Sequence, residues 1–316
     1  MRFDLRKLFT TESIPSREAW YFPIQSPDGQ WVGLPTAEDK LTVYSASQER
    51  LPGSGFLVSP DVESLALHPN GKLLACLSQD RILISDRGGR VSSSHPARTG
   101  RAPAQFVTFH PSGDSLVLIA PSGDDGDSYK LTHLAMTSFD VLKELELEGD
   151  ADGYPLASWL PDGVLQVEIN AGPNGFMTNF IHVDPESTHP ACPPYDGGEG
   201  AFVRLLSEDS ILQVSRVKAF VTDCSRSSLH GEVYFESGYF AGLRPGFWRG
   251  MVFIPLRNSE KPFDCTLQVL DSRLSKKAEI PLPDLGEYVS FWCEGPVVLA
   301  ECRESGKSTF HGWKII

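Results

Sequence analysis

The stretch from Leu65 to Asp86 decides the fold. It reads Leu-Ala-Leu-His-Pro-Asn-Gly-Lys-Leu-Leu-Ala-Cys-Leu-Ser-Gln-Asp-Arg-Ile-Leu-Ile-Ser-Asp, with three short apolar runs separated by two polar turns. In the first turn, Pro69 presets the backbone φ angle, and the Asn70-Gly71 pair accepts the positive φ that a tight hairpin needs. Each apolar run is too short for a helix, so the stretch predicts three antiparallel strands.

The same turn recurs along the first half of the chain. It is found at Ser26–Gly29, His68–Gly71, His110–Gly113 and Leu160–Gly163. The turn prolines, at positions 27, 69, 111 and 161, are spaced by 42, 42 and 50 residues, and the insertion Ser122–Ser128 accounts for the longer third spacing. A period of about 40 to 45 residues with four strands in each unit is typical of a β-propeller.

The rhythm continues beyond residue 200, although the turn motif degrades. Paired apolar runs follow at Phe202–Leu206 with Ile211–Val214, Tyr239–Leu243 with Met251–Ile254, and Tyr288–Cys293 with Val297–Ala300. The chain therefore predicts an all-β fold, a single seven-bladed β-propeller domain over residues 1–316 with four-stranded antiparallel blades. The blades are expected to start near residues 19, 62, 104, 154, 201, 238 and 287, and counts of six or eight blades are the alternatives.

Closure of the fold provides a separate check on this count. The last blade has strands at 288–293, 297–302 and 309–315 and lacks a fourth strand. Residues 2–10, Arg-Phe-Asp-Leu-Arg-Lys-Leu-Phe-Thr, alternate like a strand. We expect this amino-terminal strand to pair in the last blade and to cover an edge that would otherwise invite aggregation.

Composition excludes several classes of partner. The net charge of −13 disfavours binding to nucleic acid and to anionic membranes. The charged amino terminus has no signal-peptide pattern, and no apolar run is long enough to span a bilayer, so we expect a cytoplasmic protein. Six dispersed cysteines without a Cys-x-x-Cys pair argue against a disulfide framework or a zinc site, and we expect no cofactor.

The acidic charge is concentrated in one part of the chain. Residues 121–200 contain 15 acidic and 2 basic side chains, whereas the remaining residues contain 26 of each. If each blade runs from its inner to its outer strand, the loops between second and third strands lie at the same end as the connections between blades. We expect eight carboxylates to gather there as an acidic sector: Asp124, Asp125, Asp127, Glu148, Asp150, Asp152, Asp196 and Glu199. This concentration predicts docking of a basic partner; the alternative is that the loop acids only keep the protein in solution.

The repeats resemble the WD-repeat β-propeller family in its divergent bacterial form. Ser78-Gln79-Asp80 and the strand Ile82 to Asp86 are similar to the family's Ser-x-Asp, strand, Trp-Asp pattern, with serine in place of tryptophan. Comparable places are occupied by Val43-Tyr44-Ser45, His182-Val183-Asp184 and Val269-Leu270-Asp271, while the Gly-His and Trp-Asp dipeptides are absent. The resemblance implies a rigid platform for protein partners, similar to bacterial propellers that belong to ATPase-linked assemblies.

A second candidate contact lies in the stretch from Tyr239 to Arg249, which combines aromatic and guanidinium groups. These are the usual anchors of protein interfaces. We expect Phe240, Phe247 and Trp248 to fill the packing between blades, and Arg244 and Arg249 to be exposed contacts for a partner.

No motif for catalysis or metal binding stands out. His68 and His110 both precede a turn proline, which indicates a structural role such as hydrogen bonding to a neighbouring loop. Asp124 to Asp127 lack EF-hand spacing, and no Gly-x-Ser-x-Gly elbow is present. Gly306-Lys307-Ser308 lacks the upstream glycine of a phosphate-binding loop.

The sequence therefore favours a non-catalytic scaffold, a subunit of a larger cytoplasmic assembly that docks a basic protein partner on the acidic sector. The alternative is a propeller enzyme, a lactonase-like hydrolase or a lyase, with a metal or ligand site in the central channel. Such an enzyme would need acidic or histidine ligands on several inner strands, and the readable inner strands, Leu65–Leu67, Phe106–Phe109 and Ala157–Trp159, are apolar or small. A third interpretation is recognition of a small ligand or peptide at the mouth of the channel.

Overall fold

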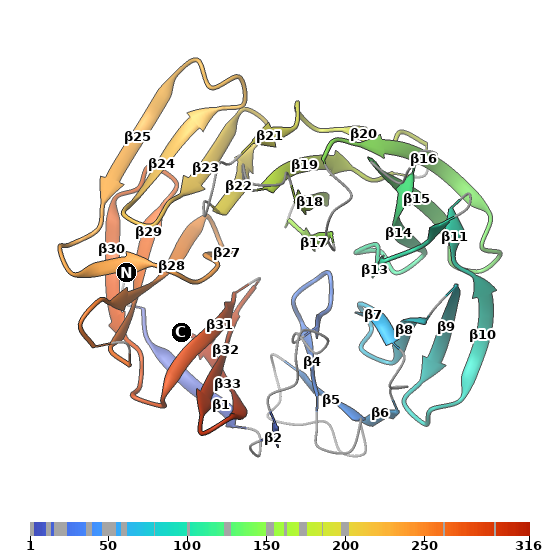
Figure 1. Ribbon diagram of the computed structural model, residues 1–316, viewed down its shortest axis with the longest axis horizontal. Helices are drawn as coiled ribbons and strands as arrows, with labels where there is room; N and C mark the ends of the chain where they lie inside the picture. Colours follow the sequence, from blue (N-terminus) through green and yellow to red (C-terminus); the bar gives the residue numbers. More distant parts are fainter. Residues whose placement is uncertain are drawn as a thin grey trace. The chain divides into compact units, whose positions relative to one another are not determined.

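The computed structural model describes residues 3–10, 14–15, 24–35, 40–45, 55–57, 62–78, 80–99, 102–122, 128–149, 155–160, 163–170, 176–184, 186–196, 202–261, 263–293 and 295–316. The chain divides into two compact units: unit 1 is Met1–Arg17 with Gly200–Ile316, and unit 2 is Glu18–Glu199. In the described residues, seven antiparallel sheets of four or five strands form the blades of a seven-bladed β-propeller, which confirms the predicted fold (Figure 1). Among the same residues, no helix has the length and apolar character needed to cross a membrane.

Unit 2 contains blades one to four. Blade one has the order β3-β4-β5-β6 (Ile24–Gln25, Trp31–Pro35, Lys40–Ser45, Gly55–Leu57). Blade two has the order β7-β8-β9-β10 (Val62–Leu67, Leu73–Ser78, Arg81–Asp86, Val91–Pro96). Blade three has the order β13-β14-β15-β16 (Phe106–Phe109, Ser115–Ser122, Ser128–Ala135, Val141–Leu147). Blade four has the order β17-β18-β19-β20 (Leu156–Trp159, Val164–Asn170, Phe176–His182, His189–Pro190), and β21 (Tyr195–Asp196) also pairs with β19.

Unit 1 contains blades five to seven. Blade five has the order β22-β23-β24-β25 (Phe202–Ser207, Ser210–Val214, Lys218–Asp223, Leu229–Tyr234). Blade six has the order β26-β28-β29-β30 (Tyr239–Ala241, Met251–Asn258, Cys265–Asp271, Lys276–Pro281), and β27 (Gly246–Trp248) pairs with β28. Blade seven has the order β31-β32-β33-β1 (Glu287–Trp292, Val297–Glu304, Lys307–Ile315, Leu5–Thr10), and β2 (Ile14–Pro15) also pairs with β33.

The amino-terminal strand completes blade seven, as expected from the sequence. β1 pairs antiparallel with β33, from Leu5 opposite Ile315 to Thr10 opposite His311. The first strands of blades two to seven begin at Val62, Phe106, Leu156, Phe202, Tyr239 and Glu287. Residue 19 lies outside the described residues, and blade one has its first described strand at Ile24. A two-stranded sheet of β11 (Arg98–Thr99) and β12 (Ala102–Pro103) between blades two and three was not predicted.

The repeated turns close as the sequence indicates. In each, the amide of the glycine donates to the carbonyl three residues earlier, at 2.8 Å for Gly29, Gly71 and Gly113 and 3.0 Å for Gly163. These four glycines have φ angles of 68°, 65°, 80° and 80°, in the left-handed region that glycine adopts at little cost.

The histidines before the turn prolines connect successive blades. His68 of blade two hydrogen bonds through Nε2 to the carbonyl of Gly113 in the turn of blade three, at 3.1 Å. His110 of blade three makes a 3.1 Å bond to the carbonyl of Val183, which follows β19 in blade four. The structural role predicted for both histidines is therefore confirmed.

This contact makes Gly113 sensitive to substitution. A Cβ atom at Gly113 would lie 2.6 Å from the His68 ring, whereas at Gly163, which has the same φ, a Cβ would meet no described atom within 4 Å. Gly113→Ala is therefore expected to lower the free energy of unfolding by about 1 kcal/mol more than Gly163→Ala, because it adds loss of the His68 bond to the shared backbone strain. Urea unfolding of the two variants checks this, and equal losses would contradict the contact.

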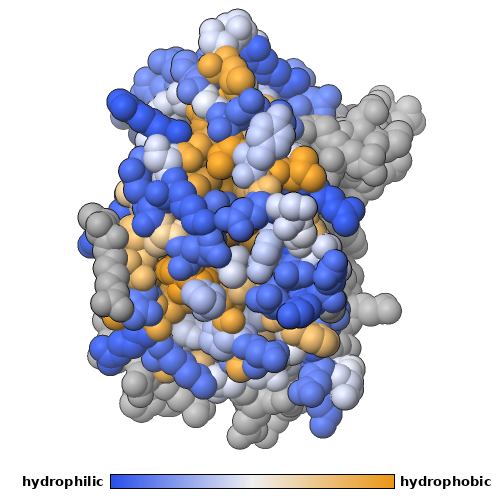
Figure 2. All heavy atoms as spheres, turned by 90° about the vertical axis from the view of Figure 1, so that its left-hand side faces the viewer, coloured by the Kyte–Doolittle hydropathy of each residue, from blue (hydrophilic) through white to orange (hydrophobic). Residues whose placement is uncertain are grey.

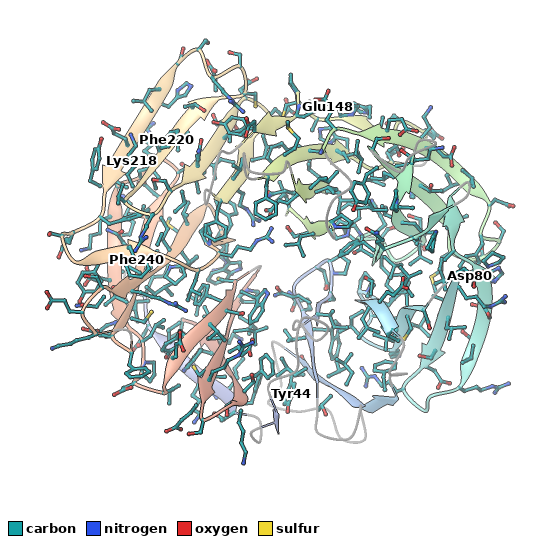
Figure 3. All side chains as sticks on the ribbon, viewed as in Figure 1. Tyr44, Asp80, Glu148, Lys218, Phe220 and Phe240 are labelled. Atoms are coloured by element: carbon teal, nitrogen blue, oxygen red, sulfur yellow. The ribbon has the colours of Figure 1, made fainter. Side chains whose placement is uncertain are left out.

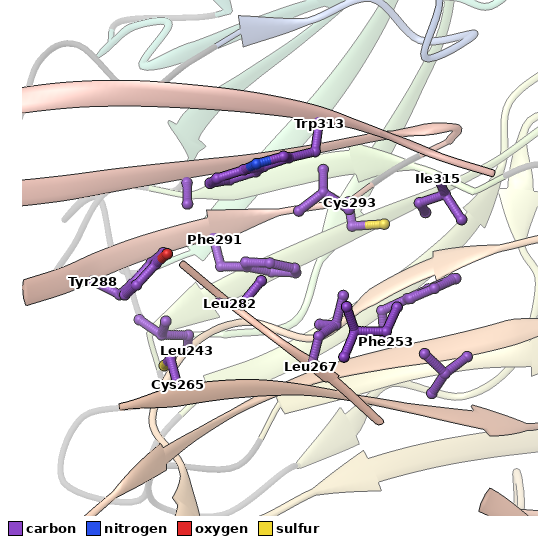
Figure 4. Packing of buried hydrophobic residues seen from close by; sticks show 14 of the residues in the cluster. Leu243, Phe253, Cys265, Leu267, Leu282, Tyr288, Phe291, Cys293, Trp313 and Ile315 are labelled. Atoms are coloured by element: carbon purple, nitrogen blue, oxygen red, sulfur yellow. The ribbon is translucent and has the colours of Figure 1, made fainter. Parts of the chain in front are cut away.

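The hydrophobic core lies between successive blades. In unit 2, Ala75, Ile82 and Val107 belong to one buried cluster of blades two and three, and Val117, Leu165 and Ile181 to another of blades three and four. In unit 1, Phe253 and Leu267 of blade six pack with Tyr288, Phe291 and Trp313 of blade seven (Figure 4). Within each unit, these clusters bury the facing surfaces of neighbouring blades.

Candidate docking surface

Two of the eight residues of the acidic sector, Glu148 and Asp196, lie in the described part of the chain, and both are exposed. The other six lie outside the described residues: Asp124, Asp125, Asp127, Asp150, Asp152 and Glu199.

Glu148 follows β16 and is fixed to the next blade through its backbone. Its amide donates to Oδ1 of Asn179 at 3.1 Å, and Nδ2 of Asn179 donates to the Glu148 carbonyl at 2.8 Å. Asn179 lies on β19 and is only 5% exposed, so this pair of bonds is shielded from water. The result is a Glu148 side chain exposed on a backbone held by two hydrogen bonds (Figure 3 labels Glu148).

Asp196 lies beside the same strand. It lies on β21 opposite Met177 of β19, two residues from Asn179. The structure thus places both Glu148 and Asp196, which are 48 residues apart in the chain, beside β19, at Asn179 and Met177 respectively.

Two further carboxylates belong to this surface and were missed in the sequence. Glu144 and Glu146 are exposed on β16, and Lys130 Nζ lies 3.5 Å and 3.7 Å from them. The alternation of acidic and apolar residues in Val141–Leu147, which reads Val-Leu-Lys-Glu-Leu-Glu-Leu, was the signal that could have identified them. β16 also carries Lys143, so Lys130 and Lys143 together offset the charges of Glu144 and Glu146.

Two serines beside these acids flank residues 123–127 in the sequence. Ser122 and Ser128 are paired across β14 and β15, and their hydroxyl oxygens are 2.8 Å apart. The Ser122 hydroxyl also donates to Oε2 of Glu146 at 2.7 Å. Ser122 and Ser128, the described residues on either side of 123–127, therefore lie next to a carboxylate of β16.

The aromatic stretch of blade six mainly fills packing positions. Phe247 packs with the buried cluster of blades five and six, and the guanidinium of Arg204 lies 5.1 Å from the centre of its ring. Trp248 packs with the cluster of blades six and seven. Arg249 is exposed with its guanidinium 4.5 Å from the Trp248 ring, whereas Arg244 is half-buried.

A buried polar network crosses blades three and four. His133 on β15 is fully buried, with Nε2 at 2.7 Å from the Ser115 hydroxyl and Nδ1 at 3.4 Å from the Thr188 hydroxyl. Burial, together with repulsion from His110, lowers the pKa of His133 to about 4. The described residues include no group of three or more His, Cys, Asp or Glu side chains that could hold a metal ion.

Comparison with solved structures supports the fold. The chain is similar over 99% of its length to the β-propeller domain of Cps50 (Swd1) from Myceliophteria thermophila, all of which is covered, with a TM-score of 0.61 and 13% sequence identity. No family model matches the sequence. No curated protein sequence matches it either.

Proposed function

We propose that this protein is a non-catalytic interaction scaffold, a subunit of a larger cytoplasmic assembly that docks a basic protein partner on the acidic sector. The observation that carries the proposal is the concentration of charge, 15 acidic against 2 basic side chains in residues 121–200. The carboxylates at Glu144, Glu146, Glu148 and Asp196 add to it, because they are exposed on strands or strand ends with a fixed backbone. A preformed charged surface loses little conformational entropy when a partner binds.

The first strands of the blades support a scaffold over an enzyme of the central channel. β7, β13 and β17 carry Val-Glu-Ser-Leu-Ala-Leu, Phe-Val-Thr-Phe and Leu-Ala-Ser-Trp, with one carboxylate among them and no histidine. A metal-dependent site would need several ligands from such strands. Arg244 and Arg249 are proposed as additional contacts for a partner.

Affinity capture of the tagged protein from its native cells, at low and moderate salt, tests the proposal. The comparison is a variant with Asp124, Asp125, Asp127, Glu148, Asp150 and Asp152 changed to Asn or Gln. Neutralising six carboxylates is expected to lower the affinity for a basic partner by about tenfold or more, since each exposed ion pair contributes roughly 0.2 to 1 kcal/mol. Salt is expected to weaken the unmodified complex because it screens exposed charges beyond about 10 Å.

A matched control carries the same number of changes on exposed acids of unit 1: Glu208, Asp209, Glu260, Asp284, Glu287 and Glu304. This variant should retain the partner. Equal loss with both variants would show that only net charge matters, and retention by both would exclude the acidic sector. Co-purification of a metabolite or metal without any protein would favour the enzyme instead.

A further inference from the structure

The turn between β23 and β24 of blade five presents an exposed arginine and an exposed valine. The backbone of this turn is fastened to the following residues, because Phe235 N donates to the Val217 carbonyl and Ala241 N to the Arg216 carbonyl, both at 3.0 Å. Val217 is 57% exposed, and Arg216 is also exposed. The turn is therefore ordered and carries an apolar and a cationic side chain next to each other.

Phe240 on β26 holds the Arg216 side chain. The guanidinium carbon lies 4.8 Å from the centre of the Phe240 ring, within the range of a cation–π contact. The Phe240 ring also lies near Gly242, where an added Cβ atom would be 3.0 Å from the ring. Within the described ranges Arg216 makes no ion pair, so its charge is positioned but not matched by a carboxylate.

The neighbouring lysine differs in this respect. Lys218 Nζ lies 3.2 Å from Glu232 and sits 5.1 Å from the Phe220 ring and 5.3 Å from the Tyr234 ring (Figure 3 labels Lys218, Phe220 and Phe240). The charge of Lys218 is thus balanced, and the contact orders Tyr234, which is 63% exposed. Arg216 is left as the cation available to a ligand.

These groups lie beside the edge of blade five. In the described part of this sheet β25 is the last strand, and it exposes Leu229 (59%) and Tyr234 (63%) with Glu232 as its single charged residue. By contrast, β16 carries Lys143, Glu144 and Glu146, and β30 carries Lys276, Lys277 and Glu279. Charged edge strands resist pairing with another chain, whereas apolar ones favour it. Hydrophobic residues interrupt the hydrophilic surface in this view (Figure 2).

We propose that Arg216, Val217, Tyr234 and Phe240 form a second docking surface, for an extended segment of a partner protein that carries a carboxylate beside an apolar or aromatic side chain. The carboxylate matches the guanidinium of Arg216, the apolar side chain covers Val217 and Tyr234, and the backbone of the segment adds to the edge of β25. Arginine and tyrosine are frequent interface anchors, and strand addition supplies main-chain hydrogen bonds. The charge requirement is opposite to that of the acidic sector, so the two surfaces accept different segments.

Fluorescence anisotropy with a synthetic peptide that alternates glutamate with phenylalanine and valine tests this proposal. The peptide is expected to bind the full chain, and Arg216→Glu is expected to weaken binding by about tenfold or more, because reversal adds repulsion to the lost attraction. Lys307→Glu, which makes the same charge change at the exposed first residue of β33 in unit 1, should change the affinity by less than about twofold.

A second variant and a second peptide test whether binding depends on the apolar contact and on the negative charge of the peptide. Val217→Asp should also weaken the glutamate peptide, and a peptide with lysine in place of glutamate should bind poorly. Hydrogen exchange of the complex should show protection of Leu229–Tyr234. The proposal is overturned if the glutamate peptide does not bind, if Arg216→Glu binds it as tightly as the unmodified chain, or if the lysine peptide binds equally well. None of these outcomes depends on the acidic sector.

Discussion

Removal of residues 3–10 is expected to lower the free energy of unfolding of unit 1 by about 5 kcal/mol or more, because it deletes several hydrogen bonds and large apolar contacts at once. β1 pairs with β33 over five positions, and Asp4 exchanges two 3.1 Å backbone hydrogen bonds with Ile316. Phe3 and Leu5 pack with the core of blades six and seven, where the Phe3 and Phe253 rings meet edge to face at 6.2 Å. Without this strand, β33 would present an unpaired edge.

Gly312 shows how closely this strand fits. A Cβ atom at Gly312 would collide with the Phe9 ring, so β33 can accept Phe9 only because that position has no side chain. Denaturant unfolding of the truncated chain tests the prediction, and a peptide of residues 1–15 added in trans should restore stability. An unchanged unfolding midpoint after truncation would contradict the closing role of β1.

The second large effect is loss of stability in mild acid. His133 and His311 are both buried, and burial lowers the pKa of each to about 4; Lys7 adds repulsion at His311, as His110 does at His133. An unfolded histidine has a pKa of about 6.5, so between pH 6.5 and 4 the unfolded chain binds protons that the folded chain does not. Stability is therefore complete above pH 6.5 and decreases as the pH falls towards 4, by on the order of 2 to 3 kcal/mol for each histidine.

The variant His133→Gln isolates one of these groups. As the pH falls from 6.5 to 4, the free energy of unfolding of this variant should decrease less steeply than that of the unmodified chain. The difference in slope is about 1.4 kcal/mol per pH unit, the value for one proton. The control is His230→Gln, because His230 is exposed on β25. If the free energy of unfolding changed with pH in the same way in His133→Gln and in the unmodified chain, His133 would not be held neutral by burial.

The fold could be predicted because its repeated turns are local signals. Proline, an Asx or serine residue and glycine stand together in sequence and dictate each hairpin without reference to distant residues. The division of two strands was not predicted, although prolines mark both places in the sequence. The first strand of blade six is split into β26 and β27 around Pro245, which has no amide to donate to a ladder. The outer strand of blade four is similarly split into β20 and β21 on either side of Pro193-Pro194.

The candidate site could be predicted only as a region. The count of charged residues showed that residues 121–200 are acidic. It did not show the two hydrogen bonds between Glu148 and Asn179, which depend on the packing of two blades. Asn179 was visible as a polar residue within the otherwise mainly apolar run Phe-Met-Thr-Asn-Phe-Ile-His. The exposure of Arg216 and Val217 likewise follows from the turn between β23 and β24, which carries no sequence motif.

Hydrogen exchange of the protein with its captured basic partner tests the central claim most directly. The account predicts slower exchange in residues 123–127, at Glu144–Asp152 and at Asp196, with loss of this protection when the six carboxylates of the acidic sector are neutralised. Protection confined to other blades, unchanged by that variant, would contradict the account.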